Sequence, residues 1–277
     1  MNILNKFKEL IRGEKARHIV INYAAGKYDN TLDSVIATYD NADEDIQKYV
    51  KVVRGRSRTL AKDNPFYRKY LESLVKYVVG SEGFKLQVQG RNADGSFDTA
   101  ANDLIEREFE QVWAYMCDDL GEMNFYDMCC IIIKSVARDG EVFIVVNRNA
   151  TNKYRYTLRL YEADAVPVDY NRKLSNGNEI VMGIEKDKNG RRVNYYFETK
   201  SKNKYIVIPA DRVIHLYRPE RIGQTRGIPW THASIVYAAH LYKYIEAAVI
   251  NARVGAAKMG YIEREDMSGD IIGLGNE

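Results

Sequence analysis

The segment RPERIGQTRGIPW, residues 218–230, decides how the later part of this chain is expected to be arranged. Its cationic and amide side chains are Arg218, Arg221, Gln224 and Arg226. Two glycines permit tight turns, and Pro229 presets the first turn of a helix that follows. We expect residues 218–230 to form a rigid elbow, pinned by arginine hydrogen bonds and ending at Trp230. An anion site at the helix N-terminus is the alternative.

A long helix is predicted after the elbow. Residues 231–259 are alanine-rich, contain no proline and have Gly255 as their single glycine. At 1.5 Å per residue, such a helix would be roughly 40 Å long. A helix of that length must either cross so small a domain or leave it. We assign it residues 229–260, and expect the glycine-rich residues 267–277 to belong to a loop.

The first half of the chain is predicted to be mainly helical. Residues 45–79 carry apolar side chains at helical spacing. Within them, Asn64-Pro65 has the pattern of an N-cap followed by proline at the first helical position. Residues 84–89 (FKLQVQ) alternate apolar and polar side chains, which predicts a strand. Two more helices are expected over residues 99–117 and 124–138.

Strands are predicted to dominate the second half. Residues 141–147 (EVFIVVN) form an uninterrupted apolar run, which indicates a strand buried on both faces. Four further strand segments are expected, at residues 154–161, 179–185, 192–198 and 205–208. Helices followed by an antiparallel meander are typical of an α+β fold. We therefore expect an N-terminal arm over residues 1–50 and an α+β domain over residues 51–228.

Composition sets weak limits on function. The net charge of +3 and the sequence pI near 8.5 leave nucleic-acid binding open. Three cysteines, Cys117, Cys129 and Cys130, fit neither a disulfide framework nor a metal motif, as expected in a reducing compartment. The first residues lack the pattern of a signal peptide, and no apolar run is long enough to span a membrane. These features predict a soluble intracellular protein.

The common catalytic motifs are absent from the sequence: a P-loop, a dinucleotide-binding glycine motif, a GxSxG elbow and an HExxH zinc pair. The strongest catalytic fragment is Asp139-Gly140-Glu141, because two carboxylates beside a strand could hold Mg²⁺ in a nuclease. Many such sites also carry a lysine on the following strand, and residues 142–146 contain none. We favour a simple helix–glycine–strand turn whose end charges are solvated, without a catalytic, cofactor or metal site.

Basic residues crowd one predicted helical region: Arg54, Arg56, Arg58, Lys62, Arg68 and Lys69. They could contact phosphate groups. They could instead face solvent or another subunit, and this second interpretation is the one that we favour.

Four collinear segments resemble the lambda family of phage portal proteins. The elbow, preceded by IPADRVIHLY at 208–217, is similar to the hallmark region of that family. RGRSRTLAKDNPFYRKYLESLVKYVVGSEGFKLQV at 54–88 resembles its arginine-rich helix and helix-to-strand step. KSVARDGEVFIVV at 134–146 and GIEKDKNGRRVNYYF at 183–197 resemble its "DGE" turn and its hairpin. The resemblance covers most of residues 20–262.

The resemblance implies a structural subunit and not an enzyme. Portal proteins form a ring, typically of twelve subunits, at one vertex of the capsid. Double-stranded DNA is pumped through this ring by a separate terminase and later leaves by the same route. The implied partners are further copies of the chain, double-stranded DNA, the terminase large subunit, the major capsid protein and head-completion proteins, without a cofactor or a membrane. The implied location is the virion, after assembly in the host cytoplasm.

On the family plan, residues 51–228 would be the wing and residues 229–260 the stem helix that lines the channel. Residues 261–277 would begin the clip, so the chain is truncated relative to the family. Along the stem helix, Lys243, Arg253 and Lys258 fall within an arc of roughly 140° that also contains His240 and Glu246. We expect this mixed stripe to face DNA; the alternative is that its charges face other protein. The alternative functions are a metal-dependent nuclease acting through Asp139 and Glu141 and a scaffold protein without DNA contact.

Overall fold

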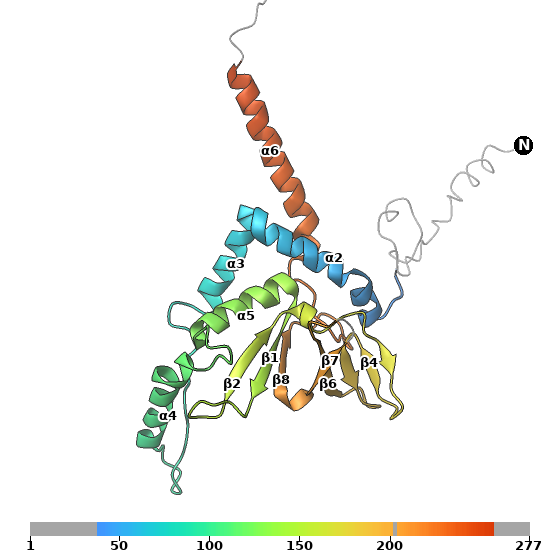
Figure 1. Cartoon of the computed structure of the whole chain (residues 1–277). Coiled ribbons are helices and arrows are strands. Elements are labelled where there is room, and N and C mark those ends of the chain that lie inside the picture. Colours follow the sequence, from blue (N-terminus) through green and yellow to red (C-terminus); the bar gives the residue numbers. More distant parts are fainter. Residues whose placement is uncertain (1–37, 202–203, 258–277) are drawn as a thin grey trace, which may run out of the picture. The chain divides into compact units, whose positions relative to one another are not determined.

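The computed structural model describes residues 38–201 and 204–257 (Figure 1). The chain divides into two compact units, Met1–Asp40 and Asn41–Glu277. The described residues leave out nearly all of the first unit, Lys258, and the predicted start of the clip at 261–277 with its loop at 267–277. The second unit is a mixture of helices and antiparallel sheets, which confirms the predicted α+β class.

Two capped helices open the second unit. α2 (Ala42–Asp63) begins with a capping box, in which the Asn41 side chain accepts from the backbone N–H of Glu44 and the Glu44 carboxylate accepts from that of Asn41. α2 therefore starts within the stretch expected to be an arm. In α3 (Pro65–Val78), the Asn64 side chain caps the backbone N–H of Tyr67 at 2.9 Å. The predicted break at Asn64-Pro65 is confirmed.

The strand predicted at residues 84–89 is wrong. These residues form no regular secondary structure and pair with no strand of the described residues. Side chains of α4 (Thr99–Gln111) take up part of the hydrogen bonding instead. The backbone N–H of Val88 donates to the Glu106 carboxylate at 2.7 Å, and that of Gly90 donates to Asn102 Oδ1 at 2.9 Å. An alternating pattern is not sufficient for a strand, which also needs a neighbouring strand to pair with.

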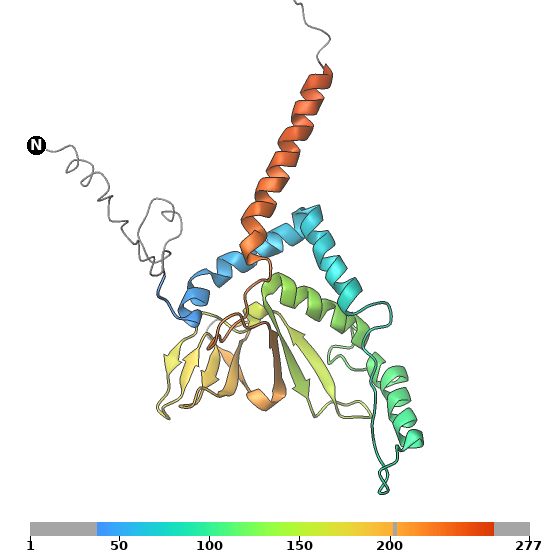
Figure 2. The ribbon, with the colours of Figure 1, turned by 180° about the vertical axis from the view of Figure 1, so that it is seen from behind.

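α5 (Phe125–Asp139) and β1 (Glu141–Asn147) form the centre of the unit. Gly140, with φ of +91°, ends α5 in the left-handed conformation that favours glycine. β1 then forms the middle of a three-stranded sheet, between β2 (Thr157–Tyr161) and β8 (Val213–Tyr217). Figure 2 shows from behind how α5 lies along this sheet.

The second sheet has five strands in the order β3-β4-β5-β6-β7, all antiparallel. Its strands are β3 (Arg172–Lys173), β4 (Glu179–Val181), β5 (Ile184–Lys186), β6 (Arg192–Glu198) and β7 (Tyr205–Pro209). The single strand expected at 179–185 is divided in two by a turn. Met182 and Gly183 form this turn with positive φ values of 48° and 80°, as a two-residue hairpin connection of the primed type requires.

β1 is buried on both faces, which explains its uninterrupted apolar sequence. Phe143 and Val145 pack toward the second sheet, together with Tyr195 and Phe197 of β6. Ile144 alternates with them and packs in the cluster that contains Met128 of α5. The prediction of a doubly buried strand is confirmed.

Short 3₁₀ turns complete the unit: η3 (Trp113–Tyr115), η4 (Ala163–Ala165), η5 (Ala210–Arg212) and η6 (His232–Ser234). The last of these leads into the long helix α6 (Ile235–Ala257). Ile235 is buried, whereas from His240 onward every α6 side chain except that of Ile245 is exposed. Within the described residues, no helix has the length and apolarity needed to cross a membrane.

Candidate functional site at the elbow

Arg226, in the middle of the elbow, is completely buried, and its guanidinium group is fully engaged. Its Nε donates to both carboxylate oxygens of Glu141, at 2.9 and 3.0 Å. Its terminal nitrogens donate to the backbone carbonyls of Val166, Met182 and Ala163, at 2.9, 2.6 and 2.8 Å. The planar fork of arginine suits such an arrangement, which an ammonium group cannot reproduce. Arg226 therefore joins the elbow to β1, to η4 and to the turn between β4 and β5.

Glu141 is the acceptor at the centre of this cluster and is also fully buried. Arg54 of α2, 1% exposed, donates to it from Nη2 at 2.8 Å and donates from Nε to the carbonyl of Asp139 at 2.9 Å. The backbone N–H of Gly227 donates to Glu141 Oε2 at 2.9 Å. One carboxylate thus binds a helix, the elbow backbone and the elbow's arginine. We call Arg54, Glu141, Arg226 and His215 the buried charge cluster.

His215 of β8 completes the cluster as a neutral group. Its Nδ1 lies 3.1 Å from Arg192 Nη1, which can only donate, so Nδ1 accepts. The proton is therefore on Nε2, which donates to Glu141 Oε2 at 2.9 Å. Burial lowers the pKa of His215 to about 4, although the hydrogen bond to Glu141 acts in the opposite direction.

The charge of Glu141 survives its burial because of its partners. Burial alone would raise its pKa, but the charge of Arg226, the hydrogen bond from His215 and the charge of Arg54 together lower the pKa well below the ordinary value. A buried carboxylate held in this way is stable only while its partners stay in place.

The interpretation of Asp139 and Glu141 as solvated charges is wrong, because both side chains are 0% exposed. Asp139 accepts from Nε of Arg58 at 2.9 Å and from Nη2 of Arg138 at 2.7 Å. Guanidinium groups occupy the positions that a divalent cation would need, which argues against the nuclease alternative. Across residues 38–201 and 204–257, no group of three or more His, Cys, Asp or Glu side chains could hold a metal ion.

Two glycines allow the elbow to contact the turn between α5 and β1. A Cβ atom on Gly227 would lie 2.1 Å from the carbonyl oxygen of Gly140, and a Cβ atom on Gly140 would lie 2.3 Å from the backbone of Ile228. The backbone N–H of Trp230 then donates to the carbonyl of Ala137, near the end of α5, at 3.1 Å. Backbone-to-backbone approach therefore fixes residues 227–230 against α5.

Gln224 and Thr225 hold the earlier part of the elbow. The buried Gln224 side chain accepts from the backbone N–H of Glu220 at 2.7 Å and donates to the carbonyl of Arg226 at 2.7 Å. The backbone N–H of Thr225 donates to Asp43, in the first turn of α2, at 2.7 Å. The acidic residues at the start of α2 therefore bind the elbow.

Arg218 and Arg221 differ from Arg226 in being more than half exposed. Arg221 pairs with Asp45 of α2 at 2.8 Å. Arg218 pairs with Glu220 at 2.9 Å, and its guanidinium lies 5.3 Å from the centre of the Trp230 ring. Trp230 packs with Tyr67, Leu71 and Ala137. All five predicted elbow residues therefore contact other residues of the elbow or residues of the helices that hold it, α2, α3 and α5. Only Arg226 belongs to the buried charge cluster.

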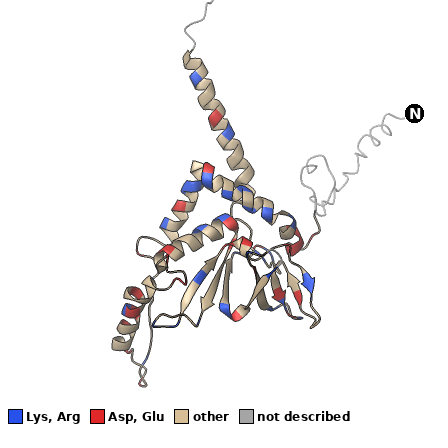
Figure 3. Ribbon diagram, viewed as in Figure 1, with Lys and Arg blue, Asp and Glu red and all other residues tan. Residues whose placement is uncertain are grey.

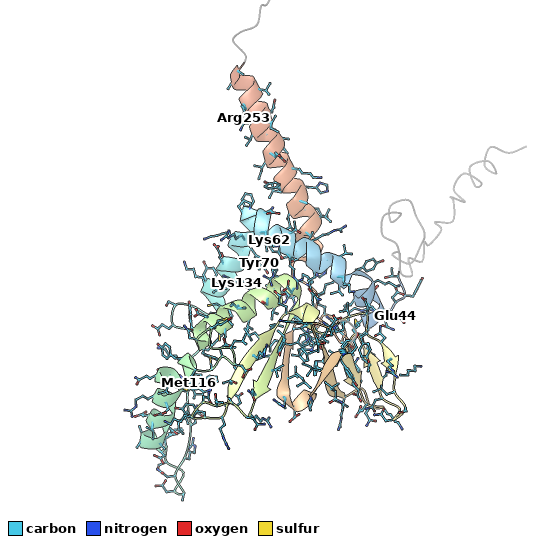
Figure 4. All side chains as sticks on the ribbon, viewed as in Figure 1. Glu44, Lys62, Tyr70, Met116, Lys134 and Arg253 are labelled. Carbon is cyan, nitrogen blue, oxygen red and sulfur yellow. The ribbon has the colours of Figure 1, made fainter. Side chains whose placement is uncertain are left out.

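The proposed DNA-facing residues lie away from this cluster. Lys243 and Arg253 are exposed side chains on α6. Figure 4 labels Arg253 in the last turns of that helix.

Sequence reasoning missed His215 and Asp43 as supports of the elbow, and it treated Arg54 as one of a group of surface cations. Arg54 was detectable in principle, because it lies at helical spacing from the apolar Ile46 and Val50, which are buried on the same face of α2.

Replacement of Arg226 by lysine is expected to destabilise the protein strongly. Arg226→Lys removes the guanidinium donors to Glu141, which keeps only those of Arg54, His215 and the Gly227 backbone. It also removes the arginine donors to three backbone carbonyls. Breaking a buried pair costs about 3–5 kcal/mol. The matched control is Arg218→Lys, whose exposed side chain should change stability by less than about 0.5 kcal/mol. Urea unfolding of both variants at one protein concentration measures the difference; equal small losses would show that the cluster contributes little.

Stability is also expected to depend on pH through His215. Because the folded state keeps His215 neutral down to about pH 4, the unfolded chain binds more protons between pH 6.5 and 4. The free energy of unfolding therefore falls as pH falls through this window. The depressed pKa of Glu141 adds a loss only below its ordinary value of 4.5.

Urea midpoints measured from pH 7 to 4.5 should therefore decrease for the wild type and change less for His215→Gln, which keeps a donor toward Glu141 but cannot titrate. His232→Gln, in η6, is the control and should keep the wild-type slope. A His215→Gln variant with the full wild-type slope would assign the dependence to another group.

Comparison with known proteins agrees with the resemblance in the sequence. The profile of the family described as "Phage portal protein, lambda family" matches residues 28–274. A "Probable portal protein" of Halomonas phage phiHAP-1 is 31% identical over 236 residues, which cover 81% of this chain and 45% of that protein. The chain therefore spans less than half the length of this curated relative. The chain belongs to the lambda family of phage portal proteins.

Proposed function

We propose that this chain is a structural subunit of a portal ring at the capsid vertex, through which double-stranded DNA is packaged and later ejected. In this proposal residues 51–228 are the wing and residues 229–260 the stem helix, with α2 extending the wing back to Ala42. Membership of the portal family supports the structural role. The terminase large subunit, the major capsid protein and head-completion proteins are the proposed partners, in a virion assembled in the host cytoplasm.

The observation that carries the proposal is the combination of a fixed elbow with an exposed, apolar helix. Exposed apolar side chains occur around α6: Val236, Tyr237, Leu241, Tyr242, Tyr244, Val249, Ile250 and Val254. A helix that exposes this many apolar side chains around its circumference is normally covered by other protein. Neighbouring copies of α6, standing side by side around a hole, would cover these side chains. The elbow would then set the direction of each helix.

Within such a ring, we assign the stripe of Lys243, Arg253 and Lys258 to the channel wall. Glu246 lies within the same stripe, and Figure 3 shows that α6 carries both basic and acidic residues, so the wall would attract DNA weakly. Contacts to phosphate groups carry no sequence information and are screened by salt, so DNA could slide past them.

Electron microscopy tests the ring. Negative-stain images of the purified full chain should show rings with a central hole. Val249→Asp, which places a charge on the exposed apolar surface of α6, should abolish them without unfolding the subunit. Ile222→Asp is the control, because Ile222 is fully exposed in the elbow and lies outside α6. Particles without a hole in the wild type, as a scaffold protein would give, contradict the proposal.

DNA packaging tests the channel wall. In a full-length portal ring, Lys243→Glu combined with Lys258→Glu should slow packaging or weaken DNA retention several-fold, because repulsion replaces weak attraction. Lys173→Glu combined with Lys188→Glu changes the charge equally on the exposed surface of the second sheet and serves as the control. Wild-type packaging rates in both variants would remove the assignment of this stripe to the lumen.

A further inference from the structure

α2 has two different faces, and both carry cations. The inner face buries Ile46, Val50, Arg54 and Ser57, and its arginine belongs to the buried charge cluster. The outer face continues onto α3 as a set of exposed basic residues: Lys48, Lys51, Arg56, Lys62, Arg68, Lys69 and Lys76. We call this set the basic strip.

The basic strip is strongly charged although the whole chain is not. Between residues 48 and 76, seven exposed cations stand against two exposed carboxylates, Asp63 and Glu72, which gives a net charge of +5. The whole chain has a net charge of only +3. Figure 3 shows basic residues distributed along both α2 and α3. The mild overall balance therefore hides a local concentration of positive charge.

Most cations of the strip lack an anionic partner in the part of the chain that the structure describes. Lys51 pairs with Asp169, and Arg68 pairs loosely with Glu72 at 3.4 Å. Over residues 38–201 and 204–257, no ion pair joins Arg56, Lys62, Lys69 or Lys76 to a carboxylate. The arginines of the buried charge cluster and those that bind Asp139, in contrast, are all paired. These four exposed charges are thus available for an external anion.

The composition of the strip favours a nucleic acid over a protein partner. Protein interfaces are depleted in lysine, and like charges placed together at them are costly. A polyanion, in contrast, gains from each additional cation because bound counterions are released. Flexible lysine side chains also suit binding to a phosphate backbone without a fixed register.

The helices that carry the strip contact α6 and the segment that precedes it. α2 and α6 contact each other, and the Tyr67 hydroxyl of α3 lies 2.6 Å from the Thr231 hydroxyl before α6. Figure 4 labels Lys62 at the end of α2 that meets α3, and Glu44 at the opposite, acidic end. The cations of the strip that follow Arg54 therefore lie in the second half of α2 and on α3.

We propose that the basic strip binds the phosphate backbone of double-stranded DNA, in addition to any contact made by α6. The proposal rests on the proposed function, since it names a second surface of the subunit that the packaged DNA touches. Binding would be independent of sequence and would weaken as salt rises.

The experiment measures binding of the full chain to a fluorescent duplex of about 30 base pairs by anisotropy at several KCl concentrations. The test variant is Arg56→Gln, Lys62→Gln and Lys69→Gln together. The control variant is Lys173→Gln, Lys188→Gln and Arg191→Gln, three exposed cations of the second sheet and its turns that remove the same charge. Circular dichroism and urea unfolding should show that both variants remain folded.

The slope of log affinity against log salt should fall by about one for each phosphate group that the protein no longer neutralises, so by about three in the test variant and little in the control. Equal losses in both variants would mean that only net charge matters and would overturn the proposal. Unchanged DNA affinity combined with lost rings would assign the strip to a neighbouring subunit and would also overturn it. Negative-stain images of the wild type test the ring separately. A failure of the proposed function can therefore be distinguished from a failure of the basic strip to bind DNA.

Discussion

The buried carboxylate of Glu141 is the constraint on which the arrangement of the described unit depends. Removing a charge from water costs several kcal/mol unless nearby donors compensate for the loss. Here the donors come from α2, from β8 and from the elbow, through Arg54, His215 and Arg226. Because α2, β1 and the segment from β8 to the elbow are far apart in the sequence, the charge can be stabilised only when all three are packed in one arrangement. The cluster therefore selects a single geometry for the elbow.

Arginine has opposite roles on the two faces of the same helix. Arg54 pairs with the buried carboxylate of Glu141. Arg58 pairs with the buried carboxylate of Asp139 and with that of Asp164, which is about half exposed. Arg56, between them, is exposed and has no ion pair among the described residues. Helical periodicity alone separates these roles, because residues 54 and 56 point about 200° apart. A count of the charges along α2 therefore includes both cations that pair with buried carboxylates and cations that are exposed on the surface.

Local signals in the sequence predicted local structure well. The Asn64-Pro65 cap, the end of α5 at Gly140 and the doubly buried β1 all depend on neighbouring residues, and all are present. Partners at long range could not be predicted in the same way. Residues 84–89 have the pattern of a strand but no neighbouring strand, and Glu141 has the pattern of a solvated charge but pairs with Arg54, 87 residues away. Pairing across such distances follows from the packed fold and not from spacing.

A rigid elbow matters because α6 is long and packs against little of the rest of the unit. At 1.5 Å per residue its 23 residues extend roughly 35 Å, so a tilt of about 10° at Ile235 would move its far end by about 6 Å. That displacement exceeds half of the distance between packed helices, which is about 8–10 Å. Copies of α6 could pack regularly only if each began at nearly the same angle. In the proposed ring, the close approach of Gly140 and Gly227, together with the hydrogen bonds of Arg226, would set that angle before any neighbouring copy is present.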